Sequence, residues 1–245
     1  MNKPWVLILG ANSDIAMAVS HKFAKNGYSI YLASRNIALL DKAASDIRIR
    51  YDVGVEVLSF DALDYSMHQS FYENLSPKPE GVILTFGILG EQKESESDFK
   101  LAKGVIDTNY TSTVSILEII AGDFEKRKSG FIVGISSVAG DRGRASNYIY
   151  GSAKAGFTAY LSGLRHRLHR SSVNVLTVKP GFVDTKMTMG MDLPKKLTAS
   201  PQEVANSIYN GVLHKRGTVY VRAIWRYIML IIRCIPEFLF KKTSL

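Results

Sequence analysis

The sequence of 245 residues contains one cysteine, Cys234, so an internal disulfide is impossible. Disulfide frameworks of secreted proteins and cysteine-rich zinc or iron–sulfur sites are therefore excluded, and a reducing, cytoplasmic compartment is favoured. Acidic residues are also scarce, because 22 Asp and Glu stand against 31 Lys and Arg, which gives a net charge of +9. That charge suits nucleic acid, an anionic membrane surface or an acidic ligand, and does not choose among them.

Long uncharged hydrophobic runs are missing as well. The apolar run at residues 5–9 is short for a signal peptide, and it meets Asp14 without a small-residue cleavage site. We therefore interpret it as a buried strand. The overall composition, 46% apolar and 22% charged, is typical of one folded domain, and we find no internal repeat or low-complexity tract.

Short β-rich apolar runs alternate along the chain with longer segments of helical spacing. The runs are continuously hydrophobic, which is typical of strands that are covered on both faces. This alternation predicts an α/β fold, a single-domain, doubly wound, Rossmann-like parallel sheet of about seven strands. The expected strands are 5–9, 28–33, 55–60, 82–86, 131–135, 173–178 and 218–221, and the expected helices are 13–26, 36–50, 64–75, 98–128 and 148–170.

The first strand leads directly into a turn and a helix. Backbone N–H groups at such a helix start can hold a pyrophosphate, although an ordinary strand–helix turn with one glycine has the same sequence. The candidate cofactor-binding residues in this turn are Gly10, Asn12, Ser13, Asp14 and Ile15.

The end of the second strand indicates which dinucleotide is preferred. A carboxylate at this place would bind the ribose 2′-hydroxyl of NAD, whereas the chain has Ser34 and Arg35. An arginine fork pairs well with a 2′-phosphate, so we expect NADP (NADPH) in preference to NAD, the alternative being a solvated arginine. Asp61 ends the third strand, where it either faces the adenine amino group or serves a turn.

A serine, a tyrosine and a lysine follow the fifth strand in an arrangement that suits carbonyl chemistry. Tyr150 and Lys154 stand four residues apart, on one face of a helix that starts at the carboxyl edge of the sheet. A phenol with a pKa near 10 needs a nearby cation to act at neutral pH, and Lys154 is placed to supply it. Ser137 is placed to bind the carbonyl oxygen.

These motifs, in this order, resemble the short-chain dehydrogenase/reductase family over about residues 4–221. The family's serine precedes its tyrosine by thirteen positions, as Ser137 precedes Tyr150, and Asn109 stands where the family has an active-site asparagine. The resemblance implies that Tyr150 is the general acid in reduction, that Lys154 lowers its pKa and binds the nicotinamide ribose, that Ser137 orients the substrate and that Asn109 positions a relay water. It also implies cofactor contacts from Gly87, Pro180, Gly181, Val183 and Thr185, and a homodimer or homotetramer.

Two positions depart from the family pattern. Asp14 replaces a glycine where the backbone approaches phosphate, and like charges about 4 Å apart repel by roughly 1 kcal/mol in water, so we expect Asp14 to point away and to favour the helix dipole. The segment after the fourth strand, Thr85-Phe86-Gly87, keeps a glycine but lacks the family's amide side chains. Without these amides, the hydrogen bonds that support the site in the family are in question here.

The segment after the sixth strand, residues 179–190, is longer and richer in methionine than a simple connection. Such a loop beside a sheet edge serves as a lid or as ordinary packing, and the sequence does not separate the two. A helix is expected to start next, with Ser200 as N-cap, Pro201 in its first turn and Glu203 completing a capping box.

The carboxyl-terminal residues 222–245 form a basic, amphipathic tail beyond a reductase domain of residues 1–221. The tail has five basic residues and one acidic residue, a net charge of +4, and its apolar stretch is interrupted by arginines and Pro236. It suits peripheral attachment at the inner face of the cytoplasmic membrane, the alternative being packing on the domain or between subunits. With the Gly10–Ala16 turn, it resembles the family branch that includes the decaprenyl-phosphoryl keto-pentose reductase, which implies a lipid-linked keto-sugar substrate.

The leading hypothesis is an NADP(H)-dependent oxidoreductase that interconverts a ketone and a secondary alcohol on a small-molecule or lipid-linked substrate. One alternative is a soluble reductase of ketoacyl groups on an acidic carrier protein, attracted by Arg142, Arg144 and residues 165–170, or a steroid-type carbonyl reductase. Another is a non-catalytic NADP sensor. Nucleic acid is not expected, since no base-reading motif accompanies the charge. His166 and His169 lack carboxylate or cysteine companions, so no metal is expected either.

Overall fold

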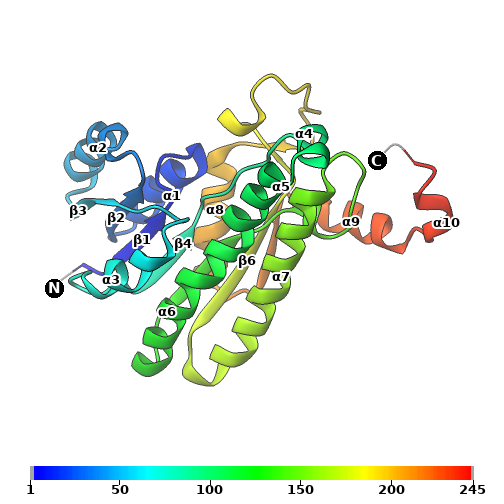
Figure 1. Ribbon diagram of the computed structural model, residues 1–245. Coiled ribbons are helices and arrows are strands. Elements are labelled where there is room, and N and C mark those ends of the chain that lie inside the picture. Colours follow the sequence, from blue (N-terminus) through cyan, green and yellow to red (C-terminus); the bar gives the residue numbers. More distant parts are fainter. Residues whose placement is uncertain (1–2, 244–245) are drawn as a thin grey trace.

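The computed structural model describes residues 3–243 and has the predicted doubly wound architecture (Figure 1). Seven parallel strands form one sheet in the order β3-β2-β1-β4-β5-β6-β9. The strands are β1 (Trp5–Leu9), β2 (Ser29–Ser34), β3 (Val55–Ser59), β4 (Gly81–Leu84), β5 (Phe131–Ile135), β6 (Asn174–Pro180) and β9 (Thr218–Val221). The fold class and the approximate strand number predicted from the sequence are thus confirmed.

Helices cover both faces of the sheet because successive side chains of a strand point to opposite faces. In β1, Val6 and Ile8 pack under one layer of helices, and Leu7 and Leu9 pack under the other. The first layer contains α1 (Asp14–Lys25), α2 (Asp41–Tyr51) and α8 (Pro201–Leu213). The second contains α3 (His68–Glu73), α6 (Ser112–Arg127) and α7 (Tyr148–Leu168), and Figure 1 shows α6 and α7 side by side.

Several elements differ from the sequence prediction. The helix expected at 98–128 is divided into α5 (Phe99–Ile106), a π-helical turn η3 (Asp107–Thr111) and α6. A polar helix α4 (Gln92–Ser97) and a two-stranded sheet of β7 (Phe182–Val183) and β8 (Thr198–Ala199) were not predicted. The expected capping box at the start of α8 is present, with Ser200 and Glu203 bonding each other's backbone N–H groups.

The carboxyl-terminal tail folds back onto the domain through α9 (Ile224–Cys234) and α10 (Glu237–Phe240). Trp225, Met229 and Ile232 lie on one face of α9 and pack with Val138 in a separate small hydrophobic cluster. Within residues 3–243, every helix falls short of the length and apolar character that a membrane-spanning segment needs.

The strand order fixes where a ligand can bind. β1 lies in the middle of the sheet, with β2 on one side and β4 on the other, so the chain reverses its direction of winding between β1 and β4. In such sheets the crevice at the carboxyl ends of the strands, beside this switch point, is the usual ligand site. The segments that follow β1, β4, β5 and β6 all start at this edge.

Candidate active site

A cavity of about 510 Å³ opens at the carboxyl edge of the sheet. Its volume lies within the range of typical small-molecule sites. The cavity brings together ten of the residues predicted from the sequence, which come from segments up to 170 positions apart: Ile15, Gly87, Asn109, Ser137, Tyr150, Lys154, Pro180, Gly181, Val183 and Thr185.

Asn109 lies in the π-helical turn η3 and is fully buried. Its amide nitrogen Nδ2 donates hydrogen bonds to the carbonyl oxygens of Ile88 at 2.7 Å and Val105 at 2.9 Å. Its oxygen Oδ1 is buried without a hydrogen-bond partner among the described residues, at the wall of the cavity. π-Helical turns are rare and often mark functional sites, because they redirect one side chain out of the regular helix.

Lys154 is buried in α7, with its ammonium group at the cavity wall. Nζ donates one hydrogen bond, to the carbonyl oxygen of Ile135 at 3.0 Å. Burial lowers the pKa of Lys154 from 10.5 to about 8, since within residues 3–243 no carboxylate compensates the loss of hydration. An ammonium group has three protons, so donors remain for a ligand in the cavity.

Tyr150 and Ser137 face the same cavity, and the electrostatics of Tyr150 differ from the expectation. Burial raises the pKa of Tyr150, and the nearby Ser137 hydroxyl opposes this effect only in part. The Lys154 ammonium stands 5.7 Å from the centre of the Tyr150 ring and is directed to Ile135 instead. The predicted lowering of the Tyr150 pKa by Lys154 is therefore wrong for this state of the protein, and Tyr150 is a neutral phenol at pH 7.

The turn after β1 is shaped by Gly10, which has a φ of +90°. A Cβ atom there would lie 2.6 Å from the backbone nitrogen of Phe86, so the position requires glycine. Ser13 caps α1 by accepting a hydrogen bond from the Ala16 backbone nitrogen at 3.1 Å. The Asn12 amide donates to Ser34 Oγ at 2.8 Å, which joins this turn to the end of β2.

The sequence model described as "short chain dehydrogenase" matches residues 4–196 of the chain. The protein belongs to the short-chain dehydrogenase family. An uncharacterized oxidoreductase of Mycobacterium tuberculosis is 34% identical over 240 residues, which cover 97% of this chain and 96% of the relative.

Two solved structures illustrate the fold that this chain shares with other proteins. A short-chain dehydrogenase from Sphingobium yanoikuyae in complex with NADPH superimposes with a TM-score of 0.82 at 23% identity, covering 96% of this chain and 97% of the other. A 7β-hydroxysteroid dehydrogenase superimposes with a TM-score of 0.88 at 17% identity, covering 100% and 99% of the two chains.

The cavity and turn of this short-chain dehydrogenase fit a dinucleotide. The first backbone N–H groups of α1 have no carbonyl partners within the helix, and the Ser13 side chain accepts only that of Ala16. N–H groups of this kind would suit a pyrophosphate. The spare donors of Lys154 suit ribose hydroxyls, and the unpartnered Oδ1 of Asn109 suits a hydrogen-bond donor inside the cavity.

Asp14, the departure from the family's glycine pattern, is held by a distant segment. Its Oδ2 accepts a hydrogen bond from the Lys186 backbone nitrogen at 2.8 Å. As the first residue of α1 it also stands in the favourable field of the helix N-terminus. The carboxylate therefore links the start of α1 to the loop that follows β7.

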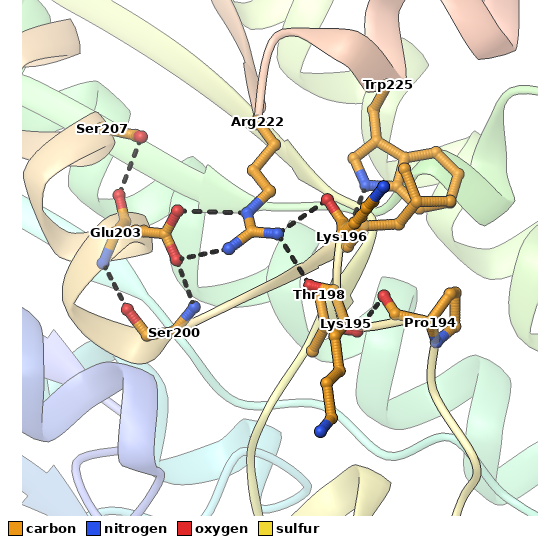
Figure 2. Close-up of polar contacts among 10 residues, drawn as sticks. Pro194, Lys195, Lys196, Thr198, Ser200, Glu203, Ser207, Arg222 and Trp225 are labelled. Atoms are coloured by element: carbon orange, nitrogen blue, oxygen red, sulfur yellow. Dashed lines mark hydrogen bonds and ion pairs between the residues drawn. The ribbon is translucent and has the colours of Figure 1, made fainter.

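The loop at residues 184–197 is fixed at both ends and carries methionines between them. Met187 and Met191 line the cavity, and Met189 is 82% exposed. At the far end, Arg222 donates to the carbonyl oxygens of Lys195 and Lys196 and pairs with Glu203, as Figure 2 shows. The arrangement fits a short lid between two anchors, although packing alone would place methionines in the same way.

Seven predicted cofactor residues do not line the cavity: Gly10, Asn12, Ser13 and Asp14 in the turn after β1, and Ser34, Arg35 and Asp61 around the carboxyl ends of β2 and β3. Ser34 accepts the hydrogen bond from Asn12, and Arg35 is exposed without an ion pair among residues 3–243. Asp61 Oδ1 accepts a hydrogen bond from the Leu63 backbone nitrogen at 3.0 Å, so one of its oxygens serves the turn. Their contacts with a cofactor stay predictions.

The structure adds site residues that sequence reasoning missed. The Thr85 hydroxyl donates to the carbonyl oxygens of Leu9 at 2.8 Å and Gly10 at 3.0 Å, and so braces the ends of β1 and β4 in place of the family's amides. Arg144 and Trp225 line the cavity. Thr85 was detectable as a hydroxyl at a strand end, whereas Trp225 lies in the tail, and only the folded chain brings it to the site.

Proposed function

We propose that this short-chain dehydrogenase is an NADPH-dependent carbonyl reductase, acting reversibly between a ketone and a secondary alcohol. The observation that carries the proposal is the convergence of Asn109, Ser137, Tyr150 and Lys154 on one cavity beside the switch point of the sheet. A non-catalytic NADP sensor would not need a buried lysine without a counter-charge, which costs stability.

The cofactor, when bound, supplies the hydride for the carbonyl carbon. Tyr150 holds the proton that the carbonyl oxygen receives, and the burial that raises its pKa keeps it a proton donor at neutral pH. Ser137 orients that oxygen by a hydrogen bond. Lys154 binds the ribose hydroxyls and supplies positive charge near the phenolate that forms. Asn109 holds, through its unpartnered Oδ1, the relay water that returns a proton to Tyr150.

Arg35 supports the proposed preference for NADPH. It is exposed at the carboxyl end of β2, next to Ser34, with its guanidinium unpaired among residues 3–243. A guanidinium without an ion pair at the end of β2 can form a charge-assisted, two-pronged contact with a 2′-phosphate. The 2′-hydroxyl of NADH is uncharged and cannot form an ion pair with it.

The experiment that tests the function is the substitution Tyr150→Phe, assayed by NADPH oxidation with a panel of ketones. Loss of the proton donor is expected to reduce kcat by at least 10²-fold. NADPH binding, followed by fluorescence transfer, should change little by comparison. Tyr148→Phe is the matched control, because Tyr148 begins the same helix but is exposed. Full turnover by Tyr150→Phe contradicts the assignment.

We further propose that the substrate is a bulky, largely apolar ketone, of which a lipid-linked keto-sugar is the favoured case. The cavity is also lined with apolar side chains from several segments of the chain, which suits a large apolar group: Leu89, Val138, Ile149, Phe182, Met187, Met191 and Trp225. A steroid-type ketone has the same apolar bulk and is the alternative that a substrate panel separates.

The tail supports a proposal of peripheral membrane contact. The face of α9 that carries Trp225 packs on the domain, whereas Tyr227, Leu230 and Ile231 are exposed on its outer side. An exposed apolar face of this kind among basic residues suits the interface of an anionic membrane, where each basic residue contributes about 1 kcal/mol. The net charge of +4 over residues 222–245 attracts the tail to anionic lipid headgroups.

Flotation with vesicles tests this contact. Wild-type protein is expected to float with vesicles of phosphatidylglycerol and phosphatidylcholine and to stay behind with phosphatidylcholine alone. The double substitution Leu230→Glu and Ile231→Glu should abolish flotation, because it places two carboxylates on the outer face of α9. Ile49→Glu is the control, since Ile49 is 85% exposed on the distant helix α2. Wild-type protein that does not float with anionic vesicles refutes the proposal.

Self-association is proposed from the family resemblance alone. We expect a homodimer or a homotetramer, and light scattering coupled to size exclusion measures which. A monomer at micromolar concentration contradicts this expectation without affecting the proposed reaction.

A further inference from the structure

Arg144 is a cation of the cavity that the proposed reaction does not use. It comes from the loop between β5 and α7, is partly buried, and lines the same cavity as Ser137 and Tyr150. Its Nε is shielded from solvent and has no hydrogen-bond partner among residues 3–243. Burial lowers the pKa of Arg144, and no carboxylate in the described part of the chain offsets the effect.

The neighbouring Arg142, in the same loop, has a full set of partners for its guanidinium and serves a structural role. Its guanidinium pairs with Glu237 at 2.8 Å and donates to the carbonyl oxygens of Ile232 and Ile235, at the end of α9. It also stacks on the Phe240 ring at 3.9 Å. Arg142 therefore holds the tail on the domain, while Arg144, two residues later, has no comparable partner within residues 3–243.

The other charged groups at the cavity do not neutralise Arg144. Glu91 and Lys93 lie at its rim, both exposed, and neither forms an ion pair with Arg144. Lys93 pairs with Glu96 at 3.1 Å. An arginine taken partly out of water without an anion is unfavourable, and such groups in cavities commonly find their partner in a ligand.

We propose that Arg144 binds an anionic group, a carboxylate or a phosphate, carried by the ketone whose carbonyl reaches Ser137 and Tyr150. This inference rests on the proposed reductase function, and it narrows the substrate class to anionic ketones. Asn147, at the start of α7, has a buried Oδ1 that also lacks a partner among the described residues; as an acceptor it suits a hydroxyl of the same substrate and not its anionic group. The cavity thus offers both a cationic donor and a neutral acceptor to a polar substrate group.

The first experiment measures binding without turnover. Trp225 lines the cavity, so its fluorescence reports occupancy in the NADP⁺-saturated protein. The probes are 5-phenylpentanoate, its methyl ester and 4-phenylbutyl phosphate. Wild-type protein is expected to bind at least one of the two anions 10-fold or more tightly than the ester, and the tighter anion distinguishes a carboxylate from a phosphate subsite.

Substitutions then assign the preference to Arg144. In Arg144→Gln, the affinities for the anion and for the ester should differ by no more than twofold. Arg144→Lys should keep part of the preference for the anion, since the positive charge stays while the planar guanidinium is lost. Arg142→Gln is the matched control and should keep the ratio. Equal affinities in wild-type protein, or a preference that survives Arg144→Gln, overturn the subsite.

Turnover separates the subsite from the reaction. The keto acids Ph–CO–(CH2)n–CO2⁻ and their methyl esters are compared by NADPH oxidation. A kcat/KM at least 10-fold higher for an acid than for its ester supports the subsite, and equal values for acid and ester overturn it. If none of the ketones is reduced while the binding preference and its loss in Arg144→Gln hold, the subsite stands and the proposed reductase function fails.

Discussion

The buried ammonium of Lys154 gives the sharpest quantitative prediction. Burial lowers its pKa from 10.5 to about 8, a difference of about 2.5. At about 1.4 kcal/mol for each pKa unit, the folded protein is destabilised at pH 7 by about 3 kcal/mol relative to one with a neutral group in that place. This is a substantial part of the stability of an ordinary domain.

The substitution Lys154→Met removes the charge and keeps most of the length of the side chain. Loss of the hydrogen bond to the Ile135 carbonyl oxygen offsets the gain by about 1 kcal/mol. We therefore expect the free energy of unfolding of the cofactor-free protein to rise by about 2 kcal/mol at pH 7. Turnover is expected to be lost in the same variant, which is the usual exchange between stability and function.

The pH dependence distinguishes this cause from packing. Because the folded-state pKa of Lys154 lies below the unfolded one, the folded protein loses this proton first as the pH rises. The destabilisation is complete below pH 8 and disappears between about pH 8 and pH 10.5, so the stability of wild-type protein rises in that window. The advantage of Lys154→Met should shrink by about 1 kcal/mol between pH 7 and pH 9.

Urea unfolding at pH 7 and pH 9, followed by circular dichroism, measures both effects. Lys126→Met controls for the loss of a lysine, because Lys126 is exposed on α6. A Lys154→Met protein that is less stable than wild type at pH 7, or a difference that does not change with pH, refutes the reasoning.

Two further substitutions test the cofactor site. Arg35→Ala should raise the KM for NADPH by about 10- to 100-fold, since a charge-assisted hydrogen bond contributes about 1.5–3 kcal/mol. The KM for NADH should rise much less. Equal effects on the two cofactors contradict a role of Arg35 in binding the 2′-phosphate. Gly87→Ala places a Cβ atom 2.6 Å from Asn109 Oδ1 and 3.3 Å from Lys154 Nζ, so kcat/KM should fall by about 10²-fold. Gly104→Ala, with open space around its Cβ, is the control, and equal kinetics of the two variants would exclude the steric explanation.

The parts of the fold that depend on local pattern were predictable from the sequence. β1 and β5 have the expected bounds, because continuous apolar runs identify strands that are buried on both faces. The polar helix α4 was missed, since the sequence Gln-Lys-Glu-Ser-Glu-Ser has no apolar spacing to reveal it. β7 and β8 have two residues each and exist through their pairing, which no local pattern encodes.

The candidate site, like the fold, was predictable from the sequence only in part. The spacing of Tyr150 and Lys154 and the serine after β5 predicted that these side chains share one edge of the sheet, and the structure has all three at the cavity there. The sequence could not show that Tyr150 keeps its proton, because the direction of its pKa depends on burial and on the orientation of Lys154 toward Ile135.

The two loop arginines show why charge counted along a sequence is a poor guide to partners. Arg142 and Arg144 were grouped with residues 165–170 as attractions for an acidic carrier protein, yet Arg142 is occupied by Glu237 and the end of α9, about 90 residues away. Only Arg144 is left for a ligand, and it faces into the cavity. The carrier hypothesis is weakened, because Arg142 and Arg144 are two of the charges that it uses and neither is left free on the surface, so that only residues 165–170 remain to attract the carrier.

The tail is part of the cavity wall, and this limits what its removal can test. Gly181 contacts Trp225 so closely that a Cβ atom at residue 181 would lie 2.0 Å from the indole ring. The Trp225 Nε1 donates to the Leu197 carbonyl oxygen at 3.1 Å, at the end of the methionine-rich loop. Deleting residues 222–245 would therefore uncover the cavity and release that loop while also removing the exposed face of α9. Substitutions confined to Leu230 and Ile231 separate membrane contact from the integrity of the site, because both side chains point away from it.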